Sequence, residues 1–312
     1  MITIAEEPRF LWLDLTRKCQ LSCAHCYNAS GPDGTHGSMT GEQWISLLDQ
    51  AAASGVTSVQ FIGGEPTMHP DAEELVRHAL DLGLRTEIYS NLVRVTDEWW
   101  ELFQRHGVSV ATSYYSDRAE QHNAMTGRRS HARTRANIEK ALGLGIELRA
   151  GIVGDSGHII DAARRDLESL GVTRIGADHV RPFGRGAREG RSDLANLCGQ
   201  CGTGRASIGP NGEVSPCVFS GWLNVGNVQE VPLDAILSSA ALAEANASIR
   251  SAVGAARARR ADWGNCEPKQ DCAPKNNCHP KQPCQPDTAC RPRCTPNEEC
   301  SPGPLSGCDP RN

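Results

Sequence analysis

The sequence predicts an α/β fold in which parallel strands alternate with helices, and two observations carry this prediction. Between residues 8 and 182, six strand-like runs are separated by helical segments. Each of the five helical segments is followed at once by a glycine, which suits the left-handed backbone after a helix. Alternation of this kind produces parallel pairing with right-handed crossovers. An open or partial barrel and a doubly wound sheet both fit six such units.

The elements follow in order along the chain. The predicted strands lie at residues 8–16, 58–64, 85–91, 107–115, 146–153 and 174–182. The first helix begins after Thr40, which can cap it while Gln43 completes a capping box. Ile45, Leu48 and Ala52 then recur on one apolar face. Further helices are predicted at 70–82, 96–106, 131–144 and 158–170. In either architecture the working groups should lie at the carboxyl ends of the strands.

The alternation stops near residue 185. Residues 184–192 are rich in Arg and Gly, so we expect a linker there. Residues 206–208 and 213–218 flank an Asn211-Gly212 turn, which predicts a β-hairpin. One more helix is predicted at 233–250. The expected domains are a barrel over 1–185, a hairpin and helix over 186–260, and a Cys/Pro-rich tail over 261–312.

The tail has a repeat of its own. Cysteine recurs every six residues from Cys266 to Cys290, and proline stands two residues after each of these cysteines. Such a segment has no apolar face to bury and cannot form a helix or a central strand. A disordered low-complexity tail and metal binding by part of it are equally compatible with the pattern.

Composition excludes several classes of protein. The chain has 312 residues, a net charge of -5 and a mean hydropathy of -0.42, and it contains no long apolar run. We therefore expect neither a membrane nor a nucleic-acid partner. The 14 cysteines are clustered at the two ends of a long cysteine-free middle, and no secretory signal precedes them. This pattern favours metal or redox chemistry in a reducing cytoplasm over a disulfide scaffold.

Cys19, Cys23 and Cys26 form a C-x3-C-x2-C loop directly after the first predicted strand. Three thiolates on one short loop can hold three irons of a [4Fe–4S] cube and leave the fourth iron open for an exogenous ligand. The alternative is zinc, but structural zinc takes four ligands. His25 could supply the fourth only through an awkward turn beside Cys26.

This loop resembles the cluster motif of radical S-adenosylmethionine (SAM) enzymes. The resemblance implies that the open iron chelates the amino and carboxylate groups of SAM. One electron then cleaves SAM to methionine and a 5′-deoxyadenosyl radical, which abstracts hydrogen from a substrate. It also implies a partial (β/α)6 barrel with a small Cys-rich C-terminal extension, and an electron donor such as a flavodoxin or ferredoxin.

Gly63-Gly64-Glu65-Pro66 ends the second predicted strand. Glycine lets the backbone approach a ligand closely, and the Glu65 carboxylate can pair with an ammonium group. The tetrapeptide resembles the GGEP motif of the family, which holds the SAM amino group. A plain turn is the alternative, but a position after strand two of a chain with this Cys loop favours the functional interpretation.

The resemblance places further SAM contacts at or near strand ends, namely Ser90, Asn91, Ser113, Arg149 and His25. Arg149 can pair bidentately with the SAM carboxylate, although a structurally paired arginine is an equal alternative. Ser90-Asn91 is also ordinary turn chemistry, and His25 beside Cys26 also fits simple loop packing.

The pattern Cys201-x10-Gly212-x4-Cys217 resembles the start of SPASM and twitch extensions, which carry auxiliary [4Fe–4S] clusters. The resemblance implies at least one auxiliary cluster on Cys201 and Cys217, completed by Cys198 or by Cys266 and Cys272. A redox disulfide or a zinc half-site at Cys198 and Cys201 is the alternative.

Relatives with such extensions mostly modify ribosomally made peptides by crosslinking, epimerisation or oxidation. The resemblance therefore favours a peptide substrate. A dehydrogenase or other modifier of a small-molecule natural-product intermediate is the first alternative. A non-catalytic iron–sulfur sensor or carrier is the second, and it would not cleave SAM on reduction.

Overall fold

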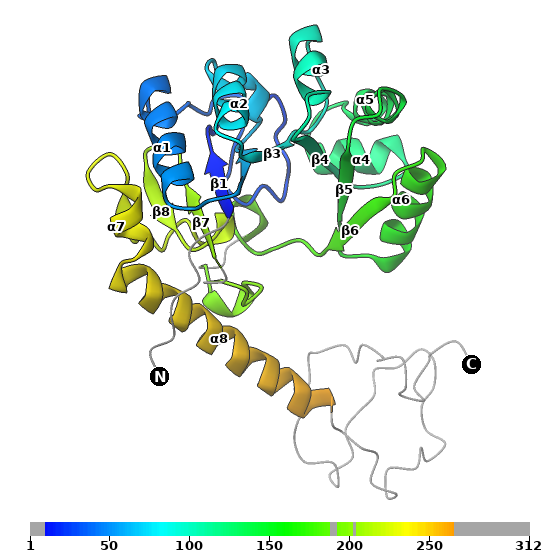
Figure 1. Ribbon diagram of the computed structural model, residues 1–312. Coiled ribbons are helices and arrows are strands. Elements are labelled where there is room, and N and C mark those ends of the chain that lie inside the picture. Colours follow the sequence, from blue (N-terminus) through cyan, green and yellow to red (C-terminus); the bar gives the residue numbers. More distant parts are fainter. Residues whose placement is uncertain (1–9, 188–191, 202–203, 265–312) are drawn as a thin grey trace, which may run out of the picture. The chain divides into compact units, whose positions relative to one another are not determined.

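A computed structural model describes residues 10–187, 192–201 and 204–264 of the chain. Its described strands form one nine-stranded sheet in the order β6-β5-β4-β3-β2-β1-β7-β8-β9 (Figure 1). Strands β1 to β6 span Phe10–Asp14, Ser58–Ile62, Arg85–Tyr89, Val108–Tyr114, Leu148–Val153 and Arg174–Asp178. They pair in parallel with their sequence neighbours, which confirms the predicted α/β fold. Within the described residues the sheet does not close, as expected of a partial barrel.

Helices connect these strands and lie along the outside of the sheet (Figure 1). Helices α1 to α6 span Gly41–Ala53, Ala72–Asp81, Asp97–Phe103, Ala119–Thr126, His131–Gly143 and Gly157–Ser169. The predicted capping box of α1 is present, because Gln43 N donates to Thr40 Oγ1 at 3.2 Å and Thr40 N donates to Gln43 Oε1 at 2.9 Å. The glycine after each of the five predicted helices has a positive φ, as expected of a left-handed residue that ends a helix.

The core lies between the sheet and these helices. Leu11 and Leu13 of β1 and Phe61 of β2 are fully buried against Leu48 of α1 and Leu75 of α2. The helices cover this outer face of the strands, and alternate side chains of the same strands point to the inner face. The strands are thereby held rigidly, and the loops at their carboxyl ends have a fixed base.

The predicted hairpin continues the same sheet. Strands β7 (Arg205–Ile208) and β8 (Glu213–Ser215) are antiparallel, and β7 pairs in parallel with β1 in the register Phe10↔Arg205. The short strand β9 (Gly226–Asn227) pairs with β8. The turns η3 (Leu194–Asn196) and η4 (Val218–Ser220) flank the hairpin. The domain boundaries at 185 and 260 stay a prediction.

The structure differs from the sequence-based elements in three places. Helix α4 was not predicted, because its sequence AEQHNAMT has almost no apolar face. The helix predicted at 233–250 is two helices, α7 (Leu233–Leu237) and α8 (Ala240–Gly264). They are separated where the Ser238 hydroxyl donates back to Asp234 O and Leu242 N donates to the Ser239 hydroxyl. The expected linker is partly a 3₁₀ turn, η2 (Gly184–Ala187), because it packs against the Cys loop.

The Cys/Pro repeat, including Cys266 and Cys272, lies outside the described residues. Within the described part of the chain, no helix combines the length and apolar character needed to cross a bilayer.

A buried histidine lies where β4 meets α4 and α5. The His122 ring contacts Tyr114, Tyr115 and His131 with ring centroids 5.1–5.2 Å apart. Its Nδ1 is buried with no hydrogen-bond partner in the described structure. Burial, with His131 as a second cause, lowers the pKa of His122 to about 4. The folded protein therefore holds this ring neutral at neutral pH.

We expect His122→Phe to reduce the loss of stability in mild acid. Between the unfolded pKa near 6.5 and the folded pKa near 4, the unfolded chain binds more protons, so stability falls as pH falls through this window. Urea unfolding at pH 7 and pH 5 should show that the variant loses about 2 kcal/mol less than the wild type between the two. His106→Phe, at an exposed position, is the control. Equal losses in the variant and the wild type would contradict a neutral buried His122.

Candidate active site

A cavity of about 350 Å³ gathers most of the predicted site residues. Its wall includes the predicted residues Cys19, Cys23, His25, Cys26, Gly63, Gly64, Asn91, Ser113 and Arg149. These residues come from the loop after β1 and from the carboxyl ends of β2, β3 and β4, apart from Arg149, which is the second residue of β5. Residues far apart in the sequence therefore meet at the carboxyl ends of the parallel strands, where α/β folds place their catalytic and binding residues.

The Cys loop is held by backbone contacts from both sides. Gly64 N donates to Thr16 O at 2.7 Å, and Glu65 N donates to Lys18 O at 2.9 Å. On the other side, Cys19 N donates to Gly31 O at 3.0 Å. The loop thus leaves β1 alongside the end of β2 and closes on itself before α1.

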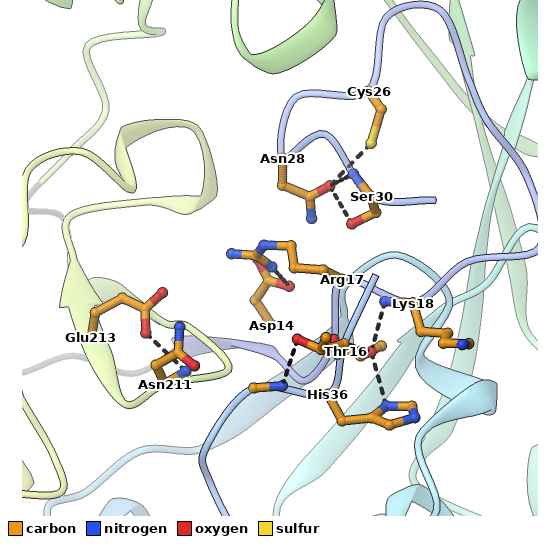
Figure 2. A network of polar contacts seen from close by, with 12 residues as sticks. Asp14, Thr16, Arg17, Lys18, Cys26, Asn28, Ser30, His36, Asn211 and Glu213 are labelled. Atoms are coloured by element: carbon orange, nitrogen blue, oxygen red, sulfur yellow. Dashed lines mark hydrogen bonds and ion pairs between the residues drawn. The ribbon is translucent and has the colours of Figure 1, made fainter. Parts of the chain in front are cut away.

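A polar network supports the loop from within (Figure 2). The Asn28 amide oxygen accepts from Cys26 Sγ at 3.0 Å, from Ser30 Oγ at 2.7 Å and from Ser30 N at 3.3 Å. Asp14, at the end of β1, pairs with Arg17 at 2.5 Å. Burial raises the pKa of Asp14, and the adjacent guanidinium opposes this rise. The loop therefore has a fixed conformation before any cofactor is considered.

Cys19 is buried, Cys23 and Cys26 are half-buried near it, and the surroundings change the pKa of two of these thiols. Burial, with the nearby Glu65 as a second cause, raises the pKa of Cys19 to about 12. Burial and the neighbouring Cys26 raise the pKa of Cys23 to about 11. Thiolates in such a place need a compensating positive charge, which iron supplies when it replaces the proton.

The site fits a [4Fe–4S] cube better than a single ion. Among the described residues, no three His, Cys, Asp or Glu side chains converge closely enough to hold one metal ion. A cube binds each thiolate through a different iron, so its ligands are spaced more widely. The His25 Nδ1 is buried in the same wall without a hydrogen-bond partner, and burial lowers the pKa of His25 to about 4. A neutral imidazole therefore faces the place where a cofactor would lie.

Gly63 and Gly64 are required by the packing of the backbone as well as by any close approach of a ligand. A Cβ on Gly64 would lie 2.3 Å from Lys18 O, and a Cβ on Gly63 would lie 2.6 Å from Thr16 O. Gly63 also has a φ of +147°, which side chains rarely allow. Only glycine lets the end of β2 lie against the backbone of the Cys loop.

A second pair of cysteines lies beside the cavity. Cys201 and Cys217 are buried in an apolar cluster with Phe183, Ile249 and Val253. Their side chains hydrogen-bond to each other, which lowers the pKa of Cys217 and raises that of Cys201. No disulfide joins any of the described cysteines, and Cys198 is exposed.

Two residues connect this pair to the cavity. Val218 and Phe219 directly follow Cys217 and line the cavity wall. The Phe219 ring meets the Tyr27 ring edge to face at 5.0 Å, and Tyr27 adjoins Cys26. The first Cys loop and the residues that follow Cys217 therefore line the same cavity.

Comparison with known proteins identifies the family. The model of the radical SAM superfamily matches residues 13–170, about half of the chain. The chain belongs to the radical SAM superfamily. The model of the SPASM iron–sulfur cluster-binding domain matches residues 198–273. Membership implies a [4Fe–4S] cluster and SAM as cofactors, and the SPASM match implies auxiliary iron–sulfur clusters.

Several relatives are similar over part of their length. A PqqA peptide cyclase of Streptomyces rochei is 30% identical over 204 residues, which cover 64% of this chain and 56% of the cyclase. The antilisterial bacteriocin subtilosin biosynthesis protein AlbA of Bacillus subtilis is 27% identical over 270 residues, which cover 74% of this chain and 60% of AlbA. The chain thus spans about half to two thirds of these relatives.

A solved structure of Streptococcus suis SuiB bound to S-adenosylmethionine shares the fold. It has a TM-score of 0.65 and 18% identity, and the match covers 78% of this chain and 68% of SuiB.

Three of the residues predicted to contact SAM lie behind the wall of this radical SAM site. Glu65 is buried, and both of its carboxylate oxygens are engaged: Oε2 accepts from Asn91 N at 2.8 Å, and Oε1 accepts from Thr67 Oγ1 at 2.7 Å. Pro66 begins the buried turn η1 (Pro66–Met68), and the Ser90 hydroxyl accepts from Leu92 N at 3.1 Å. In the structure, Glu65 ties the end of β2 to the end of β3.

The other predicted residues face the cavity with partners of their own. Arg149 donates two hydrogen bonds of 2.7 Å to Glu87. It is therefore structurally paired, as in the alternative to a SAM contact. The Ser113 hydroxyl lies 3.2 Å from Tyr89 Oη. Asn91 Nδ2 lies 3.7 Å from Cys19 Sγ. Direct SAM contacts of these residues stay predictions.

Several charged residues of the wall were not predicted from the sequence. Asp178 ends β6, His179 and Arg181 follow it, and Arg185 lies in η2. Arg181 holds Asp178 through two hydrogen bonds of 2.9 and 3.0 Å. Their position at the end of the sixth predicted strand is the signal that could have identified them. For Arg185, the Arg- and Gly-rich composition of residues 184–192 predicted a linker instead.

We expect Gly64→Ala to weaken SAM binding. The added Cβ would push the end of β2 away from the Cys loop, at a cost of about 1–3 kcal/mol. Equilibrium dialysis of SAM against the anaerobically reconstituted protein measures the effect. Gly176→Ala is the matched control, since a Cβ there meets no atom within 4 Å. Equal SAM affinity in both variants would show that the close approach at Gly64 is dispensable.

Proposed function

We propose that this chain is a radical SAM enzyme that modifies a ribosomally made peptide. The observation that carries the proposal is the shared cavity, which Cys19, Cys23 and Cys26 border on one side and the residues after Cys217 border on the other. A substrate in this cavity lies between a radical-generating site and a second site that can accept an electron. Oxidative peptide modification needs both.

The position of each group of residues indicates its proposed role. Cys19, Cys23 and Cys26 would hold the cluster, and Gly63, Gly64, Asn91, Ser113 and Arg149 would surround SAM. When bound, the reduced cluster and SAM would supply a 5′-deoxyadenosyl radical able to take a hydrogen atom from the substrate. In an oxidative outcome, the second site would accept the electron left on the substrate, and the proton would pass to solvent.

The relatives support a peptide substrate. One relative is a peptide cyclase, another is a bacteriocin biosynthesis protein, and SuiB has been solved with its precursor peptide SuiA. Cys201 and Cys217 are the proposed ligands of an auxiliary [4Fe–4S] cluster. They lie in a match to a cluster-binding domain and are buried side by side.

The proposal includes an electron donor and a compartment. A low-potential carrier such as a flavodoxin or ferredoxin would reduce the cluster. The cytoplasm would keep the thiols reduced for iron.

We expect the reconstituted chain to cleave SAM and to modify a peptide. Chromatography with mass detection should show 5′-deoxyadenosine after reduction with dithionite, and none from Cys19→Ala/Cys23→Ala/Cys26→Ala. Synthetic peptides encoded by short reading frames beside the gene are the probes, with an aminocyclitol alcohol as the small-molecule comparison. A peptide that loses two hydrogens, or that gains deuterium from solvent, supports the proposal. Oxidation of the alcohol alone would replace it with the dehydrogenase, and absence of SAM cleavage would favour a sensor.

We expect the same triple cysteine variant to keep an auxiliary cluster. Iron and sulfide assays after anaerobic reconstitution should show a loss of about four irons per chain, with about four or more remaining. Adding Cys201→Ala and Cys217→Ala should remove at least part of the remainder. If the triple variant holds no iron, Cys201 and Cys217 are not cluster ligands and the second electron acceptor is absent.

A further inference from the structure

The turn η2 crosses the Cys loop and contacts it at three carbonyl groups. Arg185 Nε donates to Cys23 O at 2.7 Å, and its Nη2 donates to Ser30 O at 2.7 Å. The Arg185 backbone N–H donates to Cys26 O at 2.9 Å. One residue therefore ties the second cysteine, the third cysteine and the end of the loop together.

The glycines on either side make this contact possible. Gly184 has a φ of +53°, and a Cβ there would lie 2.3 Å from Tyr27 O and 2.4 Å from Cys26 O. A Cβ on Gly186 would lie 2.4 Å from Arg181 O. Gly184 is thus required for the main chain of η2 to lie directly on the loop, and Gly186 lets the turn fold back against Arg181.

The loop itself makes few regular hydrogen bonds. Within residues 23–30, the hydrogen bonds between backbone groups of the loop are Cys26 N to Cys23 O and Ala29 N to Cys26 O, both at 3.2 Å, and Ala24 N donates outside the loop to Met125 O of α4 at 2.9 Å. The two bonds inside the loop are long, whereas the two guanidinium bonds are short and charge-assisted. The guanidinium spans the loop from its second cysteine to Ser30 and so limits how far Cys23 can move from Cys26.

The contact also brings a permanent charge to the site. Arginine stays protonated at all working pH values, and its planar fork can bind two carbonyls at once. Arg185 lines the same cavity as the three thiols. A fixed positive charge beside a cluster favours its reduced, more negative state and raises its reduction potential.

We propose that Arg185 is a positioning residue for the catalytic cluster: its fork holds the Cys loop in the cluster-binding conformation, and its charge raises the potential of the cluster. This rests on membership of the radical SAM superfamily and not on the identity of the substrate. It remains testable if no peptide substrate is found.

The test compares three variants with a matched control. Arg185→Met removes both the guanidinium fork and its charge, and Arg185→Lys removes the fork but keeps the charge. Gly184→Ala keeps Arg185 but displaces the turn η2. Arg174→Met removes an exposed arginine of β6 that pairs with Glu147 and is the control. Cluster loss to an iron chelator and the midpoint potential are measured on each reconstituted full chain. The iron release and the redox signal that persist in Cys19→Ala/Cys23→Ala/Cys26→Ala are subtracted.

We expect Arg185→Met to lose its cluster about ten-fold faster than Arg174→Met, because a charged hydrogen bond of the loop is lost. Its midpoint potential should fall. Arg185→Lys should keep the wild-type potential while losing the cluster faster, and Gly184→Ala should also lose the cluster faster.

Two results would overturn the proposal. Wild-type cluster retention in both Arg185→Met and Gly184→Ala would remove the positioning role. An unchanged potential in Arg185→Met would remove the role of the charge. Circular dichroism confirms that each variant is folded, and Arg185→Lys remains informative if Arg185→Met does not fold.

Discussion

The close backbone contact between the end of β2 and the Cys loop is the constraint on which the site depends. Gly64 and Glu65 donate their backbone N–H groups to carbonyls of the β1 loop, at distances that leave no room for a side chain on Gly64. The parallel pairing of β1 with β2 brings these segments together. Glu65 then links β2 to β3 through Asn91 N. The sheet register and two glycines thus fix the first half of the cavity.

Burial of the thiols connects this architecture to the cofactor. A loop that holds Cys19 and Cys23 out of water makes their thiolates unfavourable, and their raised pKa values express that cost. Iron offsets it because the metal replaces the protons and neutralises the charge. Folding of the loop and binding of the cluster are therefore linked. A loop with so few backbone hydrogen bonds of its own depends on contacts from β2 and η2 to keep its shape.

The fold was predictable because hydrophobic periodicity and helix-ending glycines are local signals. The five helices and six strands predicted between residues 8 and 182 are all present, since each helix is followed by a glycine and the elements have apolar patterns of their own. Helix α4 lacked such a pattern, and its place is set by packing of His122 against Tyr114 and Tyr115. The meeting of the three cysteines and the glycine pair at one cavity was also predictable, because both motifs directly follow strands that pair in parallel.

Other parts of the site depend on contacts that no local pattern encodes. Arg149 is engaged by Glu87 of a strand that is not its neighbour in the sheet order, and Arg185 reaches a loop more than 150 residues earlier in the chain. Composition pointed to a linker at Arg185, since an Arg- and Gly-rich run is equally suited to a solvent-exposed connection and to close docking on another backbone. Only the fold distinguishes the two.

The strand order explains why residues next to two groups of cysteines, separated by 171 residues, meet at one cavity. Strand β7 pairs with the free side of β1, the strand that carries the first Cys loop. The turn η4 lies beside that loop, and the Tyr27–Phe219 contact joins them. A hairpin attached at the β6 edge would have been five strand positions further from β1. The order β2-β1-β7 is thus what allows one bound substrate to reach both iron–sulfur sites of the proposed enzyme.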